Sequence, residues 1–290
     1  MEPKPVIEPL PISALIPSDP AQQVDFSLLE NEQLRLKSLV ITSDEKKESP
    51  RFIAGVDASF SIEYPQWGIA SIVLLDGENQ RLAGVSDVVF SRIPYRSGFL
   101  AFREVEVYQR LYARLVESRK GDKAFEPPLL FVDGNGIFHP REFGSASHLG
   151  VALGVSSVGC AKKIAEIDGL NKKKLDVIKA EFKLLQGKGH RRDLVGNSGK
   201  TWAAAVKNSE LAYDPLIVSI GHKVSLDKAV ELVVKFSESR VVKPVNLADK
   251  LSRKILSELD REFDSHPQEN KEVLAERIRK MIALKFDFGV

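Results

Sequence analysis

Residues 129–148 read Leu-Leu-Phe-Val-Asp-Gly-Asn-Gly-Ile-Phe-His-Pro-Arg-Glu-Phe-Gly-Ser-Ala-Ser-His. The first four are an apolar run of strand length, and the carboxylate of Asp133 follows them directly. A Gly-Asn-Gly turn comes next, and the residues from 144 onward predict a helix. A carboxylate at the end of a buried strand, beside a glycine-rich loop, is suited to binding a metal ion at the edge of an α/β sheet. A turn that merely ends a strand explains Asp-Gly-Asn-Gly equally well, so this segment alone leaves both interpretations open.

The pattern on either side of this segment predicts an α/β fold built on one mixed sheet. Three strand-like runs joined by short polar links come first, which indicates an antiparallel meander. Strands and helices alternate afterwards, as in βαβ units with parallel strands. We therefore expect a central sheet of five or six strands, three of them antiparallel and then parallel ones, flanked by helices. The expected strands are residues 51–60, 69–75, 82–90, 129–133, 155–159 and 216–220.

The same patterns divide the chain into three parts. Residues 1–25 contain six prolines and no sustained periodicity, and are expected to form an irregular leader. Residues 26–245 are expected to form the α/β domain, and residues 246–290 a C-terminal helical extension. The expected helices are residues 26–47, 101–118, 144–153, 225–239, 247–263 and 268–285.

Composition excludes several classes of protein. The chain has 290 residues, of which 43% are hydrophobic and 28% charged, as in ordinary globular proteins. A net charge of +2 indicates no global field for nucleic acid, so any basic surface must be local. Cys160 is the only cysteine, which excludes an internal disulfide and a zinc–cysteine cluster. Without a secretory signal pattern or an 18-residue apolar stretch, we expect a soluble intracellular protein that does not span a membrane.

Two further carboxylates can be grouped with Asp133. Asp57 lies in the middle of the apolar run 51–60, where an unpaired buried charge is costly unless a cation neutralises it. The alternative is that Asp57 points to solvent from the other face of the strand. Glu104 lies in the first turn of the expected helix 101–118, where the helix dipole alone also favours an acid. Together the three acids could hold Mg²⁺ or Mn²⁺ and drive in-line attack on a phosphodiester.

Six segments between about residues 30 and 245 form an ordered set. They are Gly55-Val-Asp-Ala-Ser-Phe60, Pro94-Tyr-Arg-Ser-Gly-Phe-Leu-Ala-Phe-Arg-Glu104, Val132-Asp-Gly-Asn-Gly-Ile-Phe-His139, Gly144-Ser-Ala-Ser-His-Leu-Gly150, Val158-Gly-Cys-Ala-Lys-Lys163 and Ser219-Ile-Gly-His-Lys-Val-Ser225. In this order they resemble the endonuclease V family, a group of inosine-directed nucleases. The resemblance implies an RNase H-like fold. It also implies hydrolysis one nucleotide 3′ of inosine, leaving a 3′-hydroxyl and a 5′-phosphate.

The resemblance also implies roles for catalytic residues. It makes Asp57, Glu104 and Asp133 the metal-binding catalytic carboxylates, with Mg²⁺ or Mn²⁺ as the cofactor. Lys162 matches a lysine near the scissile phosphate, where a cation stabilises developing charge. His222 matches a histidine close to the active centre, and a hydrogen-bonded structural histidine is the alternative. We also expect Asp227 as a fourth acid near the metals, although an acid that favours a helix N-terminus is at least as plausible.

A second group of residues is expected to bind the substrate. The family's aromatic wedge corresponds to Pro94 and Tyr95, and an aromatic face can replace the stacking of an extruded base at ~1–3 kcal/mol. The alternative is that Tyr95 is a loop aromatic that caps the core. The family commonly has isoleucine or valine at the next position, where this chain has Arg96, a candidate phosphate contact. The residues expected to line the hypoxanthine pocket are Gly98, Leu100, Gly134 and Gly136. His139 matches a family histidine close to the active centre and is grouped with the substrate-binding residues, with a hydrogen-bonded structural histidine as the alternative, while His148 is expected to be structural.

Local charge adds a possible nucleic-acid surface. Residues 160–200 contain eleven Lys or Arg against five acids, which could track a phosphate backbone or simply form a solvated face. The segment Gly196-Asn-Ser-Gly-Lys-Thr201 is not a P-loop, because two residues rather than four separate its glycines.

The expected partner is inosine-containing single-stranded RNA, with deoxyinosine DNA as a second substrate, because residues 185–199 resemble the eukaryotic type of the family. We expect a monomer, acting in the cytoplasm or the nucleus. Two rivals remain: another RNase H-like repair or junction-resolving nuclease, and a protein that binds inosine-containing nucleic acid without cutting it. The wedge and pocket motifs argue against the first rival, and the three retained carboxylates argue against the second.

Overall fold

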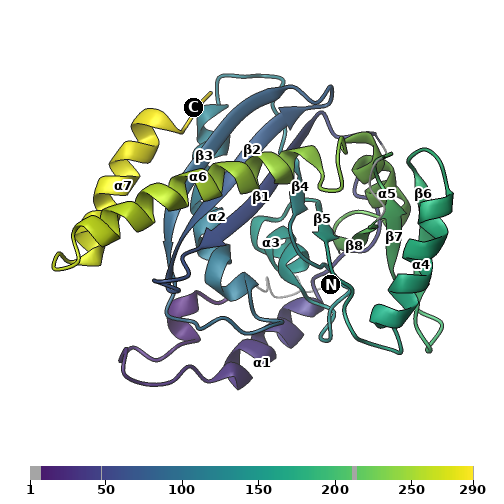
Figure 1. Ribbon diagram of the computed structural model, residues 1–290, viewed down its shortest axis with the longest axis horizontal. Helices are drawn as coiled ribbons and strands as arrows, with labels where there is room; N and C mark the ends of the chain where they lie inside the picture. Colours follow the sequence, from purple (N-terminus) through teal and green to yellow (C-terminus); the bar gives the residue numbers. More distant parts are fainter. Residues whose placement is uncertain (1–7, 47, 211–213, 290) are drawn as a thin grey trace, which may run out of the picture.

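A computed structural model describes residues 8–46, 48–210 and 214–289. Within these residues, one sheet of eight strands has helices on both faces (Figure 1). The strand order is β3-β2-β1-β4-β5-β8-β7-β6. The strands are β1 (Phe52–Phe60), β2 (Trp67–Asp76), β3 (Arg81–Phe90), β4 (Leu129–Val132), β5 (Ser157–Ala161), β6 (His190–Val195), β7 (Thr201–Lys207) and β8 (Leu216–His222). The helices are α1 (Phe26–Lys37), α2 (Ala101–Ser118), α3 (Ser145–Leu153), α4 (Lys172–Leu184), α5 (Leu226–Lys235), α6 (Lys243–Ser265) and α7 (Lys271–Lys285), with a 3₁₀ turn at Ile12–Ala14.

The expected mixed sheet is confirmed, but the expected number of strands is wrong. β1, β2 and β3 form the antiparallel meander, and β1, β4 and β5 are parallel to one another. The strands that the pattern missed are β6 and β7, which continue the sheet beyond β8. β6 is a polar strand at the edge of the sheet, and the centre of β7 is alanine, so neither has the β-branched alternation that marks a strand. Helix α4, rich in lysine, was missed as well.

Each face of the sheet buries its own apolar core. On one face α5 and α6 pack over the strands, with Ile53 and Val245 in one cluster. On the other face α2 and α3 pack over the meander and β4, with Val56 and Val105 in a second cluster. Gly55 allows α6 to lie directly on β1, because a Cβ there would come within 2.1 Å of the α6 backbone. Both faces of β1 are therefore covered, as the sequence indicated.

The C-terminal helices pack against the sheet. Figure 1 shows α6 running across the front of β1 and β2, with α7 beside it. Ile255 and Phe263 of α6, and Ile278 of α7, bury against Trp67 of β2. α6 begins at Lys243, three residues before the expected boundary of the extension. No helix in the described ranges has the length and apolar character needed to cross a membrane.

Strand register sets the position of the acids. Val56 of β1 pairs with Val132 of β4, and Val132 pairs with Gly159 of β5. Because these three strands are parallel, the residues that follow those positions lie together at the carboxyl ends of the strands. Asp57 and Asp133 are the next residues along β1 and β4, so they are neighbours there.

Candidate active site

Three acids from three elements meet at the carboxyl edge of the parallel strands. Asp57 and Asp133 lie on neighbouring strands, whose spacing is about 4.8 Å. Asp57 is on the face covered by α6, while Glu104 approaches from α2 on the other face. Asp57 is 9% exposed and Glu104 7% exposed, so both carboxyl groups are largely removed from water. This is the grouping that the sequence indicated for Asp57, Glu104 and Asp133.

The surroundings of these acids favour their protonated forms. Burial, followed by the charges of Asp133 and Asp249, raises the pKa of Asp57 to about 8. Burial, followed by the charge of Asp57, raises the pKa of Glu104 to about 8. A divalent cation among such carboxylates would reverse both effects, because it supplies the opposite charge to buried oxygens. An all-oxygen set of hard ligands fits Mg²⁺ or Mn²⁺.

Lys162 already engages one of the acids. It follows the last residue of β5, and its Nζ lies 2.6 Å from Asp133 Oδ2. In the described residues, no three His, Cys, Asp or Glu side chains are grouped closely enough to form a metal site as they stand. The residue types and their burial therefore fit a bound cation. The Asp133 carboxylate, however, now pairs with Lys162 and would have to leave this ion pair in order to bind the cation.

Helix α6 contributes an acid that the sequence patterns did not identify. Asp249 raises the pKa of Asp57 by its charge, and Ser252 Oγ lies 3.4 Å from Asp57 Oδ2. Asp249 also pairs with Arg253, with 2.6 Å between Oδ1 and Nε. A signal was present in the sequence: Asp249 and Ser252 are polar positions beside the buried Ala248 on an otherwise amphipathic helix.

Asp227, the acid expected instead, does not lie with the other three. Its side chain is 87% exposed at the start of α5, where it pairs with Arg191 at 2.6 Å. It is not among the charges that shift the pKa of Asp57 or Glu104. Lys188, which precedes β6, reaches the carbonyl of Val234 near the other end of α5. Asp227 therefore fits the alternative of an acid that favours a helix N-terminus.

His222 lies at the opposite end of the sheet from the acids. It pairs with Ser157, the first residue of β5, and its Nδ1 accepts a hydrogen bond from the Ile41 amide at 3.2 Å. Burial, followed by the charge of Lys223, lowers the pKa of His222 to about 4. These contacts fit the alternative of a structural histidine.

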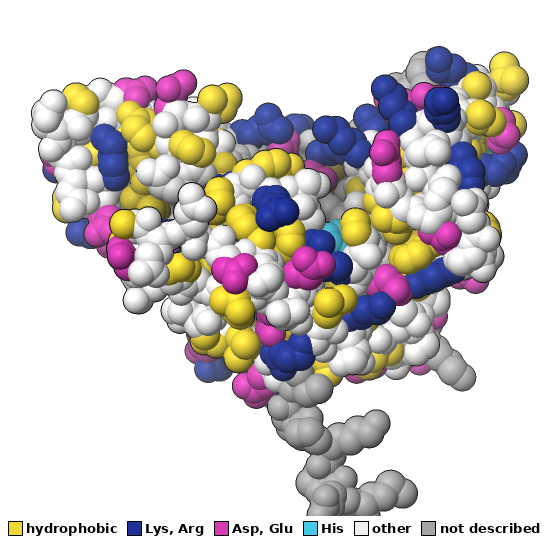
Figure 2. Space-filling view, turned by 90° about the horizontal axis from the view of Figure 1, so that it is seen from below, with side chains coloured by type: hydrophobic (Ala, Val, Ile, Leu, Met, Phe, Trp, Pro, Cys, Tyr) yellow, Lys and Arg dark blue, Asp and Glu magenta, His cyan; other side chains and the backbone are white. Residues whose placement is uncertain are grey.

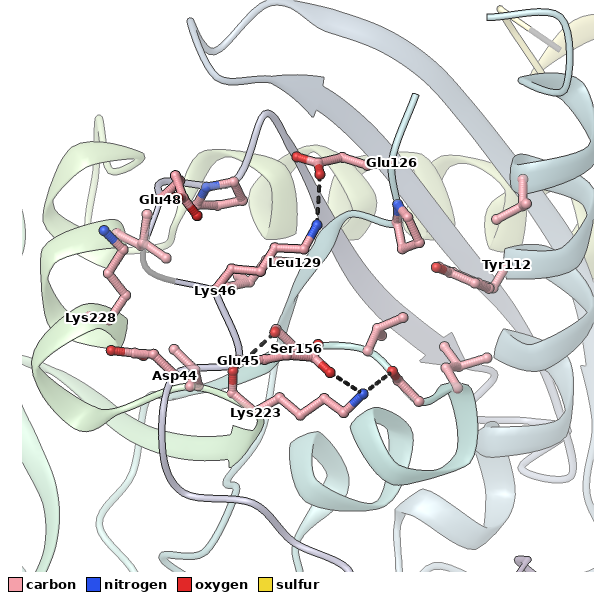
Figure 3. Close-up of a pocket in the computed structure, with 18 residues that line it drawn as sticks. Asp44, Glu45, Lys46, Glu48, Tyr112, Glu126, Leu129, Ser156, Lys223 and Lys228 are labelled. Atoms are coloured by element: carbon pink, nitrogen blue, oxygen red, sulfur yellow. Dashed lines mark hydrogen bonds and ion pairs between the residues drawn. The ribbon is translucent and has the colours of Figure 1, made fainter. Parts of the chain in front are cut away.

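A pocket at the same end of the sheet is separate from the acids (Figure 3). Its floor includes Leu129, which begins β4, whereas Asp133 follows the last residue of that strand. Around the rim, Lys46 pairs with Glu126 at 2.7 Å and Lys223 pairs with a second acid, Glu45, at 2.8 Å. Because these rim charges are paired with one another, the pocket gives no indication of catalysis.

The loop that contains Tyr95 projects from the surface near Glu104. Pro94 is exposed and Tyr95 is 71% exposed, so the tyrosine does not cap the core. Leu100, half-buried, precedes the first turn of α2 and links this loop to Glu104. An exposed aromatic ring only nine residues before a catalytic acid suits the expected wedge.

Gly98 and His139 lie side by side below this loop. Gly98 has a φ of +85°, and a Cβ there would lie 3.2 Å from His139 Nε2. His139 is 6% exposed, and its Nε2 has no hydrogen-bond partner among the described residues. Burial, followed by the charge of Arg141, lowers the pKa of His139 to about 4, so the imidazole is neutral at pH 7. The Arg141 amide donates to His139 Nδ1 at 3.3 Å, so in the neutral ring Nε2 carries the hydrogen and can donate to a base edge.

The other expected pocket residues differ in their surroundings. Gly134 lies against Ser145 at the start of α3, beside Asp133. Gly136 packs on β8, where its amide donates to Ser219 Oγ at 2.9 Å and a Cβ would meet the Ile220 carbonyl at 1.8 Å. Gly136 therefore has a packing reason to lack a side chain. His148, expected to be structural, packs against the rings of Phe102 and Phe143.

Comparisons with known proteins agree with this geometry. A family model described as Endonuclease V matches residues 34–250. Endonuclease V of Homo sapiens is 38% identical over 236 residues, which cover 79% of this chain and 82% of the human protein. The structure of the human catalytic domain has a TM-score of 0.74 at 36% identity, covering 80% of this chain and 96% of that one. Endonuclease V of Ciona intestinalis, solved with a 23mer DNA containing an inosine followed by a ribo-adenosine, has a TM-score of 0.74 at 30% identity and covers 82% and 100% of the two chains.

Proposed function

This chain belongs to the endonuclease V family and is an endonuclease, and we propose that it cuts single strands one nucleotide 3′ of inosine. The observation that supports this proposal is the arrangement of buried acids beside an exposed aromatic loop. Asp57, Glu104 and Asp133 form the cutting centre, and the loop of the exposed Tyr95 continues to Gly98, which lies beside the neutral His139. The products would be a 3′-hydroxyl and a 5′-phosphate.

Base recognition would follow from the loop and the pocket beneath it. An inosine base must leave its stack to be examined, and the exposed ring of Tyr95 can take its place. A single strand makes this exchange easier, because no base pair has to be broken. Gly98 leaves room for the base edge beside His139, whose unpartnered Nε2 can hydrogen-bond to hypoxanthine.

RNA is proposed as the main substrate and deoxyinosine DNA as the second. Similarity to the human relative supports the assignment to the eukaryotic type, which is associated with inosine in RNA. The Ciona intestinalis relative was solved with inosine followed by a ribo-adenosine, so that protein accommodates a ribonucleotide at the position after inosine.

Asp57, Glu104 and Asp133 would hold Mg²⁺ or Mn²⁺, with Asp249 close by as a further acid. The chemistry that such a cation supplies is Lewis-acid activation of water and neutralisation of charge on the phosphate. Lys162, released from its pair with Asp133, would place its ammonium on a phosphate oxygen. The carboxylate that it leaves would become available as a ligand, so Lys162 couples substrate binding to assembly of the site.

A basic surface extends away from the site over α4 and β6. Figure 2 shows Lys and Arg gathered on the raised part at the upper right, the end of the molecule where these elements lie. Several of these charges are neutralised, since Arg192 pairs with Glu181 and Lys179 with Asp214. Within the described chain, Lys172–Lys174 at the start of α4 have no ion pair. We propose that they contact the phosphate backbone, so that binding weakens as salt rises.

The proposed function can be tested with four matched oligonucleotides, RNA and DNA, each with and without one inosine. Cleavage should require both inosine and Mg²⁺, should stop in EDTA, and should be faster on RNA. Asp133→Asn should abolish cleavage, whereas Glu78→Gln, an exposed acid in the β2–β3 turn, should not. Equal cutting of strands without inosine would refute the specificity, and cutting in EDTA would refute the metal mechanism.

A further inference from the structure

A cleft adjoins the Tyr95 loop and is separate from the acids, because none of Asp57, Glu104 and Asp133 lines it. One wall is formed by residues 20–27 and Glu30, and the other by the loop around Arg96 together with Arg92 and Arg141. The first wall precedes residue 34, where the family match begins. It belongs to the face that is turned to the viewer in Figure 2, over α1 and the residues before it. This wall is therefore a feature of this chain beyond the matched region.

Two of the three arginines in the cleft hold its walls in place. Arg92 donates to the carbonyl of Pro17 at 2.6 Å, which ties the leader to the end of the meander. Arg141 donates to the carbonyl of Gly98 at 2.8 Å, which ties the Tyr95 loop to the segment after His139. Both guanidinium groups are thus committed to backbone oxygens, and they give the cleft a fixed shape.

Arg96 is not committed in this way. Its guanidinium carbon lies 4.6 Å from the centre of the Phe26 ring and 5.6 Å from that of Phe99, and the residue is exposed. Among the described residues its side chain makes no hydrogen bond or ion pair, so its N–H donors are available. The rings hold the guanidinium by cation–π contact. An oriented guanidinium with unused donors is suited to a phosphate.

The two rings, Phe26 and Phe99, also pack against each other. Phe26 and Phe99 meet edge to face with 5.0 Å between centroids, and Arg141 covers Phe99 at 4.2 Å. Phe26, at the start of α1, thereby connects the leader to the Tyr95 loop. The cleft also holds two acids, Asp25, whose carboxylate accepts from the Ser27 amide as the cap of α1, and Glu30. Its three arginines outnumber them, so the net charge of the lining is +1 beside the partly exposed ring of Phe26, which suits a nucleotide of a single strand.

The contacts of these sites give the strand a direction. Asp57 and Asp133 line a different hollow from the cleft. Gly98, beside His139 at the base pocket, accepts a hydrogen bond through its carbonyl from Arg141 of the cleft wall, so the base pocket adjoins the cleft. Cutting on the 3′ side of inosine places the 3′ flank at the acids. We propose that the cleft between residues 20–30 and the Tyr95 loop binds the nucleotides immediately 5′ of inosine, with Arg96 contacting their phosphate. This rests on the proposed function.

The test measures binding in EDTA to inosine strands with a constant 3′ flank and a 5′ flank lengthened one nucleotide at a time. Wild-type affinity should rise with the first few 5′ nucleotides. Arg96→Gln should gain roughly tenfold less affinity from these 5′ nucleotides than wild type does. The slope of log affinity against log salt concentration should fall by about 0.7 in magnitude, as for one lost phosphate contact. Arg96→Lys should restore the salt slope but only part of the affinity, because it retains charge and loses ring stacking.

Arg51→Gln, an exposed arginine at the opposite end of β1, is the matched control and should leave the 5′ dependence unchanged. Strands that begin at inosine should bind wild type and Arg96→Gln equally. If Arg96→Gln weakens those strands as much, or acts only on the 3′ flank, the cleft is not a 5′ subsite. If wild type shows no preference for inosine, the proposed function itself fails, which is a separate outcome.

Discussion

Replacing Asp57 by asparagine should stabilise the metal-free protein at alkaline pH while abolishing cleavage. The pKa of Asp57 is raised from 3.8 to about 8, first by burial and then by Asp133 and Asp249. The folded state therefore holds this proton more tightly than the unfolded state. Between about pH 4 and pH 8 the unfolded state binds fewer protons, so the free energy of unfolding falls as pH rises. Asparagine has nearly the same shape and no charge, so the fall should largely disappear.

The size of the effect follows from the shift. About four pH units at 1.36 kcal/mol each set an upper limit of ~5 kcal/mol. The charge of Asp57 is one cause of the raised pKa of Glu104, so the two shifts do not add. A realistic difference between Asp57→Asn and wild type at about pH 8.5 is ~2–4 kcal/mol. Near pH 5 the difference should be small, since both carboxyl groups remain protonated there.

Urea unfolding in EDTA, at about pH 5 and about pH 8.5, measures this difference directly. Wild type should lose stability between the two, and Asp57→Asn should lose less, its remaining loss coming from Glu104, whose pKa burial still raises. Added Mg²⁺ should restore wild type at the higher pH and leave Asp57→Asn unchanged. Glu78→Gln controls for removal of an exposed acid and should follow wild type. Equal stabilities of Asp57→Asn and wild type at about pH 8.5 would refute the reasoning.

Three further predictions concern the other residues of the site. Tyr95→Ala should weaken binding of inosine strands by ~1–3 kcal/mol in a fluorescence titration. Because the residue is 71% exposed, the thermal midpoint of unfolding should stay within about 2 °C of wild type. A large loss of thermal stability would exclude the wedge. Asp249→Asn should slow single-turnover cleavage at least ~tenfold, and Asp227→Asn should not; the reverse ranking would contradict the placement of α6 at the site. His139→Ala should reduce the preference for inosine over adenosine in competition assays. His222→Ala should retain that preference but lower the free energy of unfolding by ~1–2 kcal/mol, because the hydrogen bond from the Ile41 amide is lost.

The elements that carry Asp57 and Asp133 could be recognised without the structure. Both acids follow apolar runs of strand length, and burial on both faces of β1 was visible in the runs themselves. β6 and β7 could not be recognised, because their order comes from pairing along the edge of the sheet rather than from their own propensity. The positions of His222 and Asp227 could not be predicted either, because strand pairing places His222 beside Ser157, away from the acids, and Asp227 pairs with Arg191.

By itself, the sequence determined six of the eight described strands, most of the helices and the three candidate acids, since hydrophobic periodicity and turn residues act over a few neighbouring positions. Only the tertiary structure decided which other groups join them. Asp249 reaches Asp57 because α6 crosses the sheet, and the two residues are 192 positions apart in the chain. Likewise, Phe26 meets Arg96 because the leader folds back along the Tyr95 loop. Contacts between residues so far apart in the sequence depend on the packing of whole helices and strands, which leaves no periodic signal in either segment.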